Sequence, residues 1–189
     1  RFSLNQDKKD YFVTASRLVP YKRVDLIVEA FSHMPDKKLV VIGDGSDMKK
    51  IKAKATSNIE ILGYQPNSVM EEHMRNAKAF IFAAEEDFGI TPVEAQACGT
   101  PVIAFGKGGS LETVRPLGVD MPTGMFFEQQ NISSLISAVN LFTENQDSFE
   151  PVNCRDNALK FSVERFKNEM SNYVFQKWDH FQKSKTVTY

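Results

Sequence analysis

The sequence contains few of the residues on which disulfide-rich and metal-binding domains depend. Only two cysteines, Cys98 and Cys154, occur among 189 residues, and no ligand spacing connects them. The sequence therefore predicts neither a disulfide scaffold nor a zinc site. A chain with so little cysteine is expected in the cytoplasm.

Long apolar runs and an excess of one charge are also missing. No apolar run approaches the roughly 20 residues that span a bilayer, and the opening residues, RFSLNQDKKD, do not form a secretion signal. The net charge is −1, from 23 basic and 24 acidic residues. Because nucleic-acid-binding domains usually carry a clear basic excess, we expect no nucleic-acid partner.

Neither of the two common phosphate-binding loops is complete. Gly43 and Gly45 follow an apolar run, but Met48 stands where a dinucleotide fingerprint requires a third glycine. No G-x4-G-K-S/T segment occurs, which excludes a nucleoside triphosphatase loop. The glycines at 43–45 and 106–109 either permit tight turns with positive φ or form two turns facing one crevice.

What the sequence does contain is an alternation of short apolar runs and amphipathic stretches. The runs predict strands at 11–15, 39–42, 59–62, 79–84 and 102–105. Helical spacing of apolar residues predicts helices around 24–31, 48–55 and 69–74, the last capped by Asn67 or Ser68. Near-continuous apolar strands between such helices predict an α/β fold with a doubly wound, Rossmann-like parallel sheet.

The ends of the chain and its last third have a different pattern. Apolar positions predict a helix over 132–142 and then one long helix over 155–182, of roughly seven turns. We expect residues 1–10 to be a linker remnant, residues 11–182 to be the domain, and residues 183–189 to be a disordered tail.

Three cations follow the first predicted strand, where a sheet of this kind binds its ligands. Arg17, Lys22 and Arg23 lie in a loop that enters a helix. An arginine fork and a lysine point charge together suit a diphosphate. The alternative is a solvated basic turn that pairs with Asp25 or Glu29.

Acidic residues and a helix start follow the fourth predicted strand. Thr91 and Pro92 are typical of an N-cap and the first helical position, so the helix aims free N–H groups at the ligand side. Glu86 and Glu94 are eight positions apart, and we expect them to address different parts of one extended ligand. The alternative is that 85–87 balance the helix dipole, but a buried Glu94 would need a partner.

Taken in order, these segments resemble the nucleotide-sugar-binding half of family-4 retaining glycosyltransferases. The segments are RLVPYK from Arg17, VIGDG from Val41, EDFG from Glu86, and EAQACGTPVIA from Glu94. The resemblance covers about 11–182 and implies a GT-B fold, in which two Rossmann-like domains face a cleft. The E-x7-E segment followed by ACGTPV is its most specific part.

The resemblance implies a role for each matching residue. Arg17 and Lys22 would contact the donor diphosphate, and Glu86 the donor sugar, which makes these three the candidate catalytic residues. Donor-binding positions would be Gly43, the amides of Gly89, Ile90 and Thr91, Glu94 on the ribose, and Tyr64 and Gln65 against the nucleobase. The family usually has glycine where Ser16 and Arg23 stand, and Arg23 brings bulk and charge to the diphosphate loop.

The implied activity is transfer of a hexose from a nucleoside-diphosphate sugar with retention of anomeric configuration, in polysaccharide biosynthesis. No metal or other cofactor is required. GDP-mannose is the first expectation for the donor, with UDP-glucose or UDP-N-acetylglucosamine next. The alternatives are a nucleotide-sugar epimerase of the same fold and a non-catalytic nucleotide-binding module.

The resemblance also implies that an amino-terminal acceptor domain is absent from this chain, and the chain alone is expected to be inactive. Any peripheral contact with the cytoplasmic membrane face would be made by that domain. We expect the isolated chain to self-associate through the apolar residues of its last helix, or to lack order after about Trp178.

Overall fold

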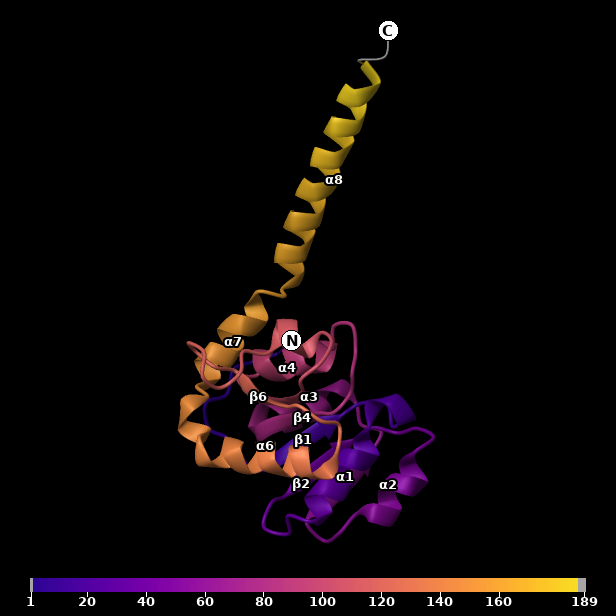
Figure 1. Cartoon of the computed structure of the whole chain (residues 1–189), viewed down its shortest axis with the longest axis vertical. Coiled ribbons are helices and arrows are strands. Elements are labelled where there is room, and N and C mark those ends of the chain that lie inside the picture. The colour runs from indigo at the N-terminus through magenta and orange to yellow at the C-terminus, as the bar shows by residue number, and fades with distance from the viewer. Residues whose placement is uncertain (1, 187–189) are drawn as a thin grey trace. The chain divides into compact units, whose positions relative to one another are not determined.

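The sheet has one more strand than the sequence predicts, and all of its strands are parallel. The structure is a computed structural model that describes residues 2–186. The six strands are β1 (Lys9–Ala15), β2 (Leu39–Ile42), β3 (Ile59–Gly63), β4 (Ala77–Phe82), β5 (Val102–Phe105) and β6 (Gly124–Phe127). Their order is β3-β2-β1-β4-β5-β6 (Figure 1). The predicted doubly wound α/β sheet is confirmed, and β6 is the strand that the sequence analysis missed.

Helices connect the strands and cover both faces of the sheet (Figure 1). The longer ones in the sheet domain are α1 (Val24–Ser32), α2 (Met48–Lys54), α3 (Asn67–Asn76), α4 (Ile90–Ala97), α6 (Ile132–Glu144) and α7 (Pro151–Leu159). Short turns are η1 (Pro20–Lys22), α5 (Ser110–Thr113) and η2 (Gln146–Ser148). Helix α3 begins at Asn67 with Pro66 as its N-cap, one residue before the earliest predicted cap.

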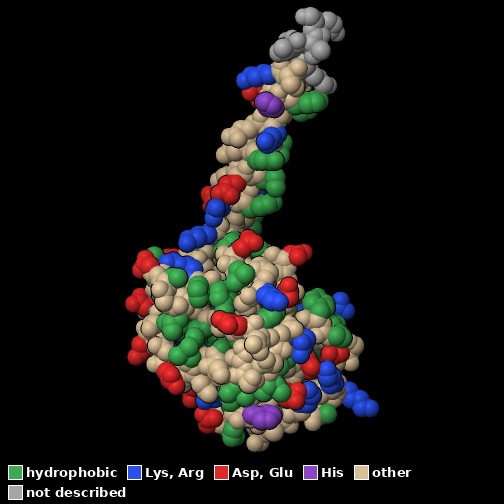
Figure 2. Space-filling model, viewed as in Figure 1, with side chains coloured by type: hydrophobic (Ala, Val, Ile, Leu, Met, Phe, Trp, Pro, Cys, Tyr) green, Lys and Arg blue, Asp and Glu red, His purple; other side chains and the backbone are tan. Residues whose placement is uncertain are grey.

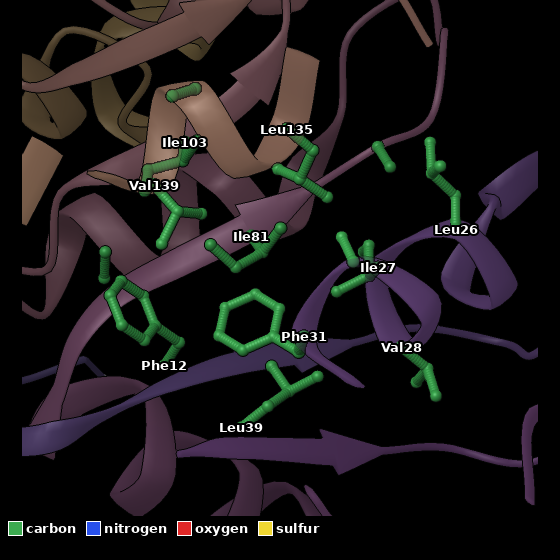
Figure 3. Close-up of a cluster of buried hydrophobic side chains, with 14 of the residues drawn as sticks. Phe12, Leu26, Ile27, Val28, Phe31, Leu39, Ile81, Ile103, Leu135 and Val139 are labelled. Carbon is green, nitrogen blue, oxygen red and sulfur yellow. The ribbon is translucent and has the colours of Figure 1, made fainter. Parts of the chain in front are cut away.

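Two apolar clusters hold the layers together, one on each face of the sheet. On the first face, Phe12, Leu39 and Ile81 pack against α1, α2 and α6 (Figure 3). The Phe12 ring meets the Phe31 ring edge-on at a centroid distance of 5.3 Å. On the second face, Val13 and its neighbours pack against α3 and α4. Parallel strands buried on both faces explain why the strand segments are apolar almost throughout.

Residues 2–8 bind the domain rather than forming a linker. The N–H of Asn5 donates to the carbonyl of Cys98 at 3.2 Å, and Phe2 packs against the second apolar cluster. The Lys8 ammonium donates to the carbonyls of Arg75 and Cys98 and to the hydroxyl of Thr100. The expectation of a linker over 1–10 is therefore wrong for the described residues. Hydrogen bonds of the backbone and of Lys8 fix this segment, and such bonds leave no apolar periodicity in the sequence.

The predicted helix over 155–182 is two helices. α7 ends at Leu159, and α8 (Val163–Thr186) begins after a break at 160–162. The Ser162 hydroxyl accepts the N–H of Arg165 at 3.3 Å and so caps α8. The apolar spacing continues across the break, so periodicity alone does not reveal it. Residues 183–186 belong to α8 rather than to a disordered tail, and the rest of that predicted tail lies outside the described residues.

The chain divides at Ala158 into the sheet domain and a second unit that contains α8. Figure 2 shows apolar side chains along one side of α8, and several of its large apolar side chains are exposed. They are Val163, Phe166, Met170, Tyr173, Val174, Phe175, Trp178 and Phe181. Ion pairs at i, i+4 spacing, Arg165–Glu169 and Lys183–Asp179, support the helix on its polar side. Among residues 2–186, no helix combines the length and apolarity needed to cross a membrane.

Candidate functional site

The predicted charged loops meet at the carboxyl ends of β1 and β4, where the strand order reverses. This reversal point is where open α/β sheets bind ligands. A pocket of about 570 Å³ opens there, lined by Tyr21, Lys22 and the segment 85–91. One of its walls comes from the loop after β1 and the other from the loop after β4.

Lys22 and Glu86 face each other across this pocket as an ion pair. Both side chains are largely buried, with exposed fractions of 16% for Lys22 and 21% for Glu86. The Lys22 ammonium also lies 5.2 Å from the centroid of the Tyr21 ring and 6.0 Å from that of Phe82. The structure therefore brings together two residues that are 64 positions apart in the sequence. The alternative expectation, that the basic turn pairs with Asp25 or Glu29, holds for Arg23, which lies 3.6 Å from the Asp25 carboxylate, but not for Lys22.

Arg17 is exposed in the loop between β1 and η1, and the glycine turn after β2 supports that loop. The N–H of Leu18 donates to the carbonyl of Asp44, and its carbonyl accepts the N–H of Asp47, both at 2.9 Å. A Cβ on Gly43, whose φ is +134°, would lie 1.8 Å from the Ser16 carbonyl oxygen. Gly43 is thus required for close approach of the two backbones.

The second glycine turn supports the Glu86 segment in the same way. The N–H of Gly109 donates to the Glu86 carbonyl at 2.7 Å. Gly108 has a φ of +61°, and a Cβ there would lie 2.4 Å from the same carbonyl oxygen. Each of the two glycine turns therefore supports one of the charged loops, at Ser16 and at Glu86.

Helix α4 begins two residues earlier than predicted. Its N-cap is Gly89, with φ of +78°, and Ile90 and Thr91 are its first two residues. Pro92 stands third, where its missing N–H costs nothing because the first turn of a helix makes no internal N–H bonds. The amides of Ile90 and Thr91 belong to this first turn, beside the pocket. A helix therefore starts in this segment, as expected, but its N-cap is Gly89 and not Thr91.

Glu94 lies one turn into α4 and is half-buried rather than fully buried as expected. Residues four apart share one face of a helix, so Glu94 lies on the same face as Ile90. Ile90 lines the pocket. The helix is held in place by Gln96, which is fully buried and donates to the Thr113 carbonyl at 2.8 Å.

Tyr64 and Gln65 lie at the same edge of the sheet but outside the Lys22–Glu86 pocket. They follow β3, which is two strands from β1, a separation of about 10 Å at ordinary strand spacing. The Tyr64 side chain is 81% exposed. Gln65 donates to the Leu62 carbonyl at 2.9 Å, and this contact fixes the turn. A ligand that reached both Tyr64 and Glu86 would therefore be an extended one.

Two further residues, Arg23 and Gln130, connect the loops around the pocket; Arg23 is one of the three predicted cations, whereas Gln130 was not found as a candidate from the sequence. Arg23 follows Lys22 and has a left-handed backbone, with φ of +53°. Its guanidinium donates to the Gln130 side chain at 2.7 Å, and the Gln130 amide donates to the Ala83 carbonyl at 2.8 Å. Gln130 lies in the loop after β6, and since that strand was not predicted, no sequence signal placed it near the site.

No metal-binding cluster accompanies these residues in the part of the chain that the structure describes. Across residues 2–186, no three His, Cys, Asp or Glu side chains are grouped closely enough to hold a metal ion. The charged groups of the pocket are instead one ion pair, Lys22 with Glu86, together with Glu85 and Asp87. Beside them lies the start of α4, which carries the partial positive charge of a helix N-terminus.

Comparison with known proteins gives matches over most of the chain. The sequence profile of the family described as "Glycosyl transferases group 1" matches residues 1–161. A GDP-mannose-dependent monoacylated alpha-(1-6)-phosphatidylinositol monomannoside mannosyltransferase of Corynebacterium glutamicum is 33% identical over 135 residues, 64% of this chain and 34% of that enzyme. A poly(glycerol-phosphate) alpha-glucosyltransferase of Bacillus subtilis is 29% identical over 181 residues, 86% of this chain and 25% of that enzyme. The matches thus span a quarter to a third of these two relatives.

Solved structures share the fold. A mutant of S. aureus TarM, in complex with fondaparinux, alpha-GlcNAc-glycerol and UDP, superposes with a TM-score of 0.76 and 22% identity over 91% of this chain and 37% of that one. Anabaena HepE, in complex with UDP and glucose, gives a TM-score of 0.74 and 21% identity over 88% of this chain and 48% of that one. The sheet domain therefore has the fold of one half of a GT-B protein.

Proposed function

Because the chain belongs to the group 1 glycosyltransferases, we propose that the Lys22–Glu86 pocket binds the diphosphate and sugar of a nucleoside-diphosphate sugar. The donated group is a hexose, transferred with retention of its anomeric configuration. The reaction breaks the bond between the anomeric carbon and the diphosphate oxygen, and the electron pair leaves with the diphosphate. A hydroxyl oxygen of the acceptor bonds to the anomeric carbon, and its proton passes to a donor phosphate oxygen.

The observation that carries this proposal is the placement of Lys22 beside the start of α4. A helix N-terminus is partially positive and favours anions nearby. A largely buried lysine beside this helix end adds a second positive charge, so an anion must lie next to the lysine and the helix end. Glu86 is that anion here. A diphosphate carries the same sign of charge and more of it, so it fits between the Lys22 ammonium and the Ile90 and Thr91 amides.

Each site residue then has a role that its geometry supports. Lys22 and the exposed Arg17 stabilise the negative charge that develops on the leaving diphosphate, which is where transition-state stabilisation is largest. Glu86, released from Lys22, accepts hydrogen bonds from sugar hydroxyls. Glu94, one turn further along α4, accepts both ribose hydroxyls, as a carboxylate can.

The far end of the donor reaches the carboxyl end of β3. Tyr64 offers an exposed ring on which a nucleobase can stack. Gly43 follows β2, which lies between β3 and β1 in the sheet, and so lies on the proposed path of the ligand. We propose GDP-mannose as the donor, supported by the mannosyltransferase relative named above, and UDP-glucose as the competing donor, supported by the glucosyltransferase relative.

Acceptor recognition is proposed to lie outside these 189 residues. Positioning two substrates together supplies about 7–11 kcal/mol of the barrier reduction in such reactions. The sheet domain by itself is therefore expected to bind donor and to transfer no sugar. The exposed apolar side of α8 is expected to cause self-association of the isolated chain.

Calorimetric titration of the purified chain tests the proposal. The ligands are GDP, UDP, GDP-mannose and UDP-glucose, with guanosine and uridine as controls that lack phosphate. We expect at least one nucleoside diphosphate to bind tenfold or more tightly than its nucleoside, since a charge-assisted contact is worth about 1.5–3 kcal/mol. Diphosphates that bind no better than their nucleosides would refute the phosphate site.

A further inference from the structure

Arg23 occupies a backbone conformation that a residue with a side chain adopts only at a cost. Its φ of 53° and ψ of 33° lie in the left-handed region, which glycine enters freely and arginine does not. It is both the C-cap of η1 and the N-cap of α1. A strained residue persists only where its surroundings hold it, and at Arg23 the contacts of the side chain do so.

Those contacts tie the Lys22 turn to the end of β4. The Arg23 Nη1 donates to Gln130 Oε1 at 2.7 Å, and Gln130 Nε2 donates to the carbonyl of Ala83 at 2.8 Å. Ala83 is buried and lies three residues before Glu86. The chain of bonds therefore starts one residue after Lys22 and ends three residues before the carboxylate with which Lys22 pairs.

A second set of contacts fixes the other side of the Arg23 guanidinium. Its Nε lies 3.6 Å from the Asp25 carboxylate, which also accepts a bond from Lys50 at 2.7 Å. The Asp25 side chain is only 11% exposed. Asp25 thereby anchors the guanidinium to α1 and, through Lys50, to α2.

The Lys22–Glu86 ion pair and the Arg23–Gln130–Ala83 bonds both join the Lys22 turn to the chain after β4, and they differ in whether donor binding would open them. If a diphosphate takes Lys22 and sugar hydroxyls take Glu86, the ion pair between these two residues opens. The Arg23–Gln130–Ala83 connection involves neither side chain and remains.

We propose that Arg23 and Gln130 are positioning residues that hold the Lys22 turn in place while Lys22 exchanges Glu86 for the donor diphosphate. This inference rests on the proposed function. It assigns Arg23 no contact with the ligand, and it gives Gln130 a role that depends on Lys22. The left-handed strain at Arg23 is explained because only a residue with a long donor side chain can make this connection.

The dependence on Lys22 gives a test. We expect Gln130→Ala to weaken nucleoside diphosphate binding about threefold to tenfold, the value of one lost hydrogen bond, and to leave nucleoside binding unchanged. Arg23→Gly should give a similar loss without backbone cost, since glycine accepts this φ. In a Lys22→Ala background both changes should have no further effect. Gln129→Ala is the matched control, because the Gln129 side chain bonds Asn131 instead.

Hydrogen exchange separates this inference from the proposed function. The N–H groups of Lys22 and Arg23 donate to the carbonyls of Val19 and Pro20, and they should exchange faster in Gln130→Ala than in Gln129→Ala, with or without ligand. Unchanged exchange at these two amides would overturn the inference. An equal loss of affinity in the Lys22→Ala background would overturn it as well. A wild-type chain that binds no diphosphate would refute the proposed function, whereas the exchange rates would still report on the connection.

Discussion

Lys8 and Lys22 lie at opposite edges of the same sheet and are held in opposite ways. Lys8 stands before β1, and its ammonium donates to two carbonyls and a hydroxyl, at 2.9, 3.1 and 2.9 Å. Lys22 stands beyond the carboxyl end of β1, and its ammonium pairs with the single carboxylate of Glu86 at a pocket. All three donor positions of the Lys8 ammonium are filled by the fold. The Lys22 ammonium has one carboxylate partner, which an anionic ligand could replace.

The two lysines also lie near opposite ends of α4, which carry partial charges of opposite sign. Lys8 binds the carbonyl of Cys98, the C-cap of α4, where a helix is partially negative and favours a cation. Lys22 lies near the other end of α4, where the helix is partially positive. At the first position three hydrogen bonds and the helix terminus offset part of the cost of burying the ammonium, whereas at the second position the Glu86 carboxylate is the partner. The amino edge therefore holds its lysine through the fold alone, whereas the carboxyl edge carries the pocket that we propose for an anionic ligand.

The largest expected effect separates the two edges by stability. Lys8→Met removes three hydrogen bonds and leaves the carbonyls of Arg75 and Cys98 without this donor, which should cost about 2–3 kcal/mol of unfolding free energy. Nucleoside diphosphate affinity should not change. Chemical denaturation and calorimetry measure the two quantities, with Lys9→Met at an exposed neighbouring lysine as control. If Lys8→Met lowered the nucleoside diphosphate affinity as well as the unfolding free energy, the two edges of the sheet would not have separate roles.

A smaller effect is expected at Glu94, on the carboxyl edge. Glu94→Gln keeps the shape of the side chain but removes its charge and one acceptor, so affinity for a nucleoside diphosphate should fall by about 1–2 kcal/mol. A 2′,3′-dideoxy ligand should bind the wild type with a similar loss and should be insensitive to the substitution. Wild-type affinity that is equal for the normal and dideoxy ligands would remove Glu94 from the ribose.

The smallest effect concerns pH and sharpens the account of the amino edge. Burial lowers the pKa of Lys8 to about 8, whereas in the unfolded chain it is near 10.4. Between these values the unfolded state binds more protons, so the Lys8 contribution to the unfolding free energy rises with pH and is lost as pH falls through about 8. The unfolding free energy of wild type relative to Lys8→Met should therefore increase from pH 8 to pH 10. A difference that stays flat, or that decreases, would contradict the assigned burial.

Most of the fold could be predicted from the sequence because it depends on local pattern. Buried parallel strands are apolar runs, so five of the six strands were found. β6 was missed because Gly124–Phe127 begins with glycine and so has only three apolar residues in a row, whereas the equally short β2 and β5 are apolar throughout. The break before Val163 was missed because the apolar spacing continues across it.

The parts of the site that could not be predicted are contacts between distant segments. The cations after β1 and the acids after β4 were identified, but their pairing as Lys22 with Glu86 depends on strand order. The Arg23–Gln130 connection depends in addition on the unpredicted β6. The glycine turns at 43–45 and 106–109 could be identified from the sequence, whereas the close contacts of Gly43 and Gly109 with neighbouring backbone appear only in three dimensions.

The central claim, that Lys22 is the lysine available to an anionic ligand, has one most direct measurement. It is the affinity of Lys22→Ala for a nucleoside diphosphate and for the matching nucleoside, by calorimetry, beside Lys49→Ala at an exposed position of α2 as control. The account predicts a loss of tenfold or more for the diphosphate, from a charge-assisted contact of about 1.5–3 kcal/mol, with no change for the nucleoside or in the control. Equal losses for both ligands, or no loss for the diphosphate, would contradict it.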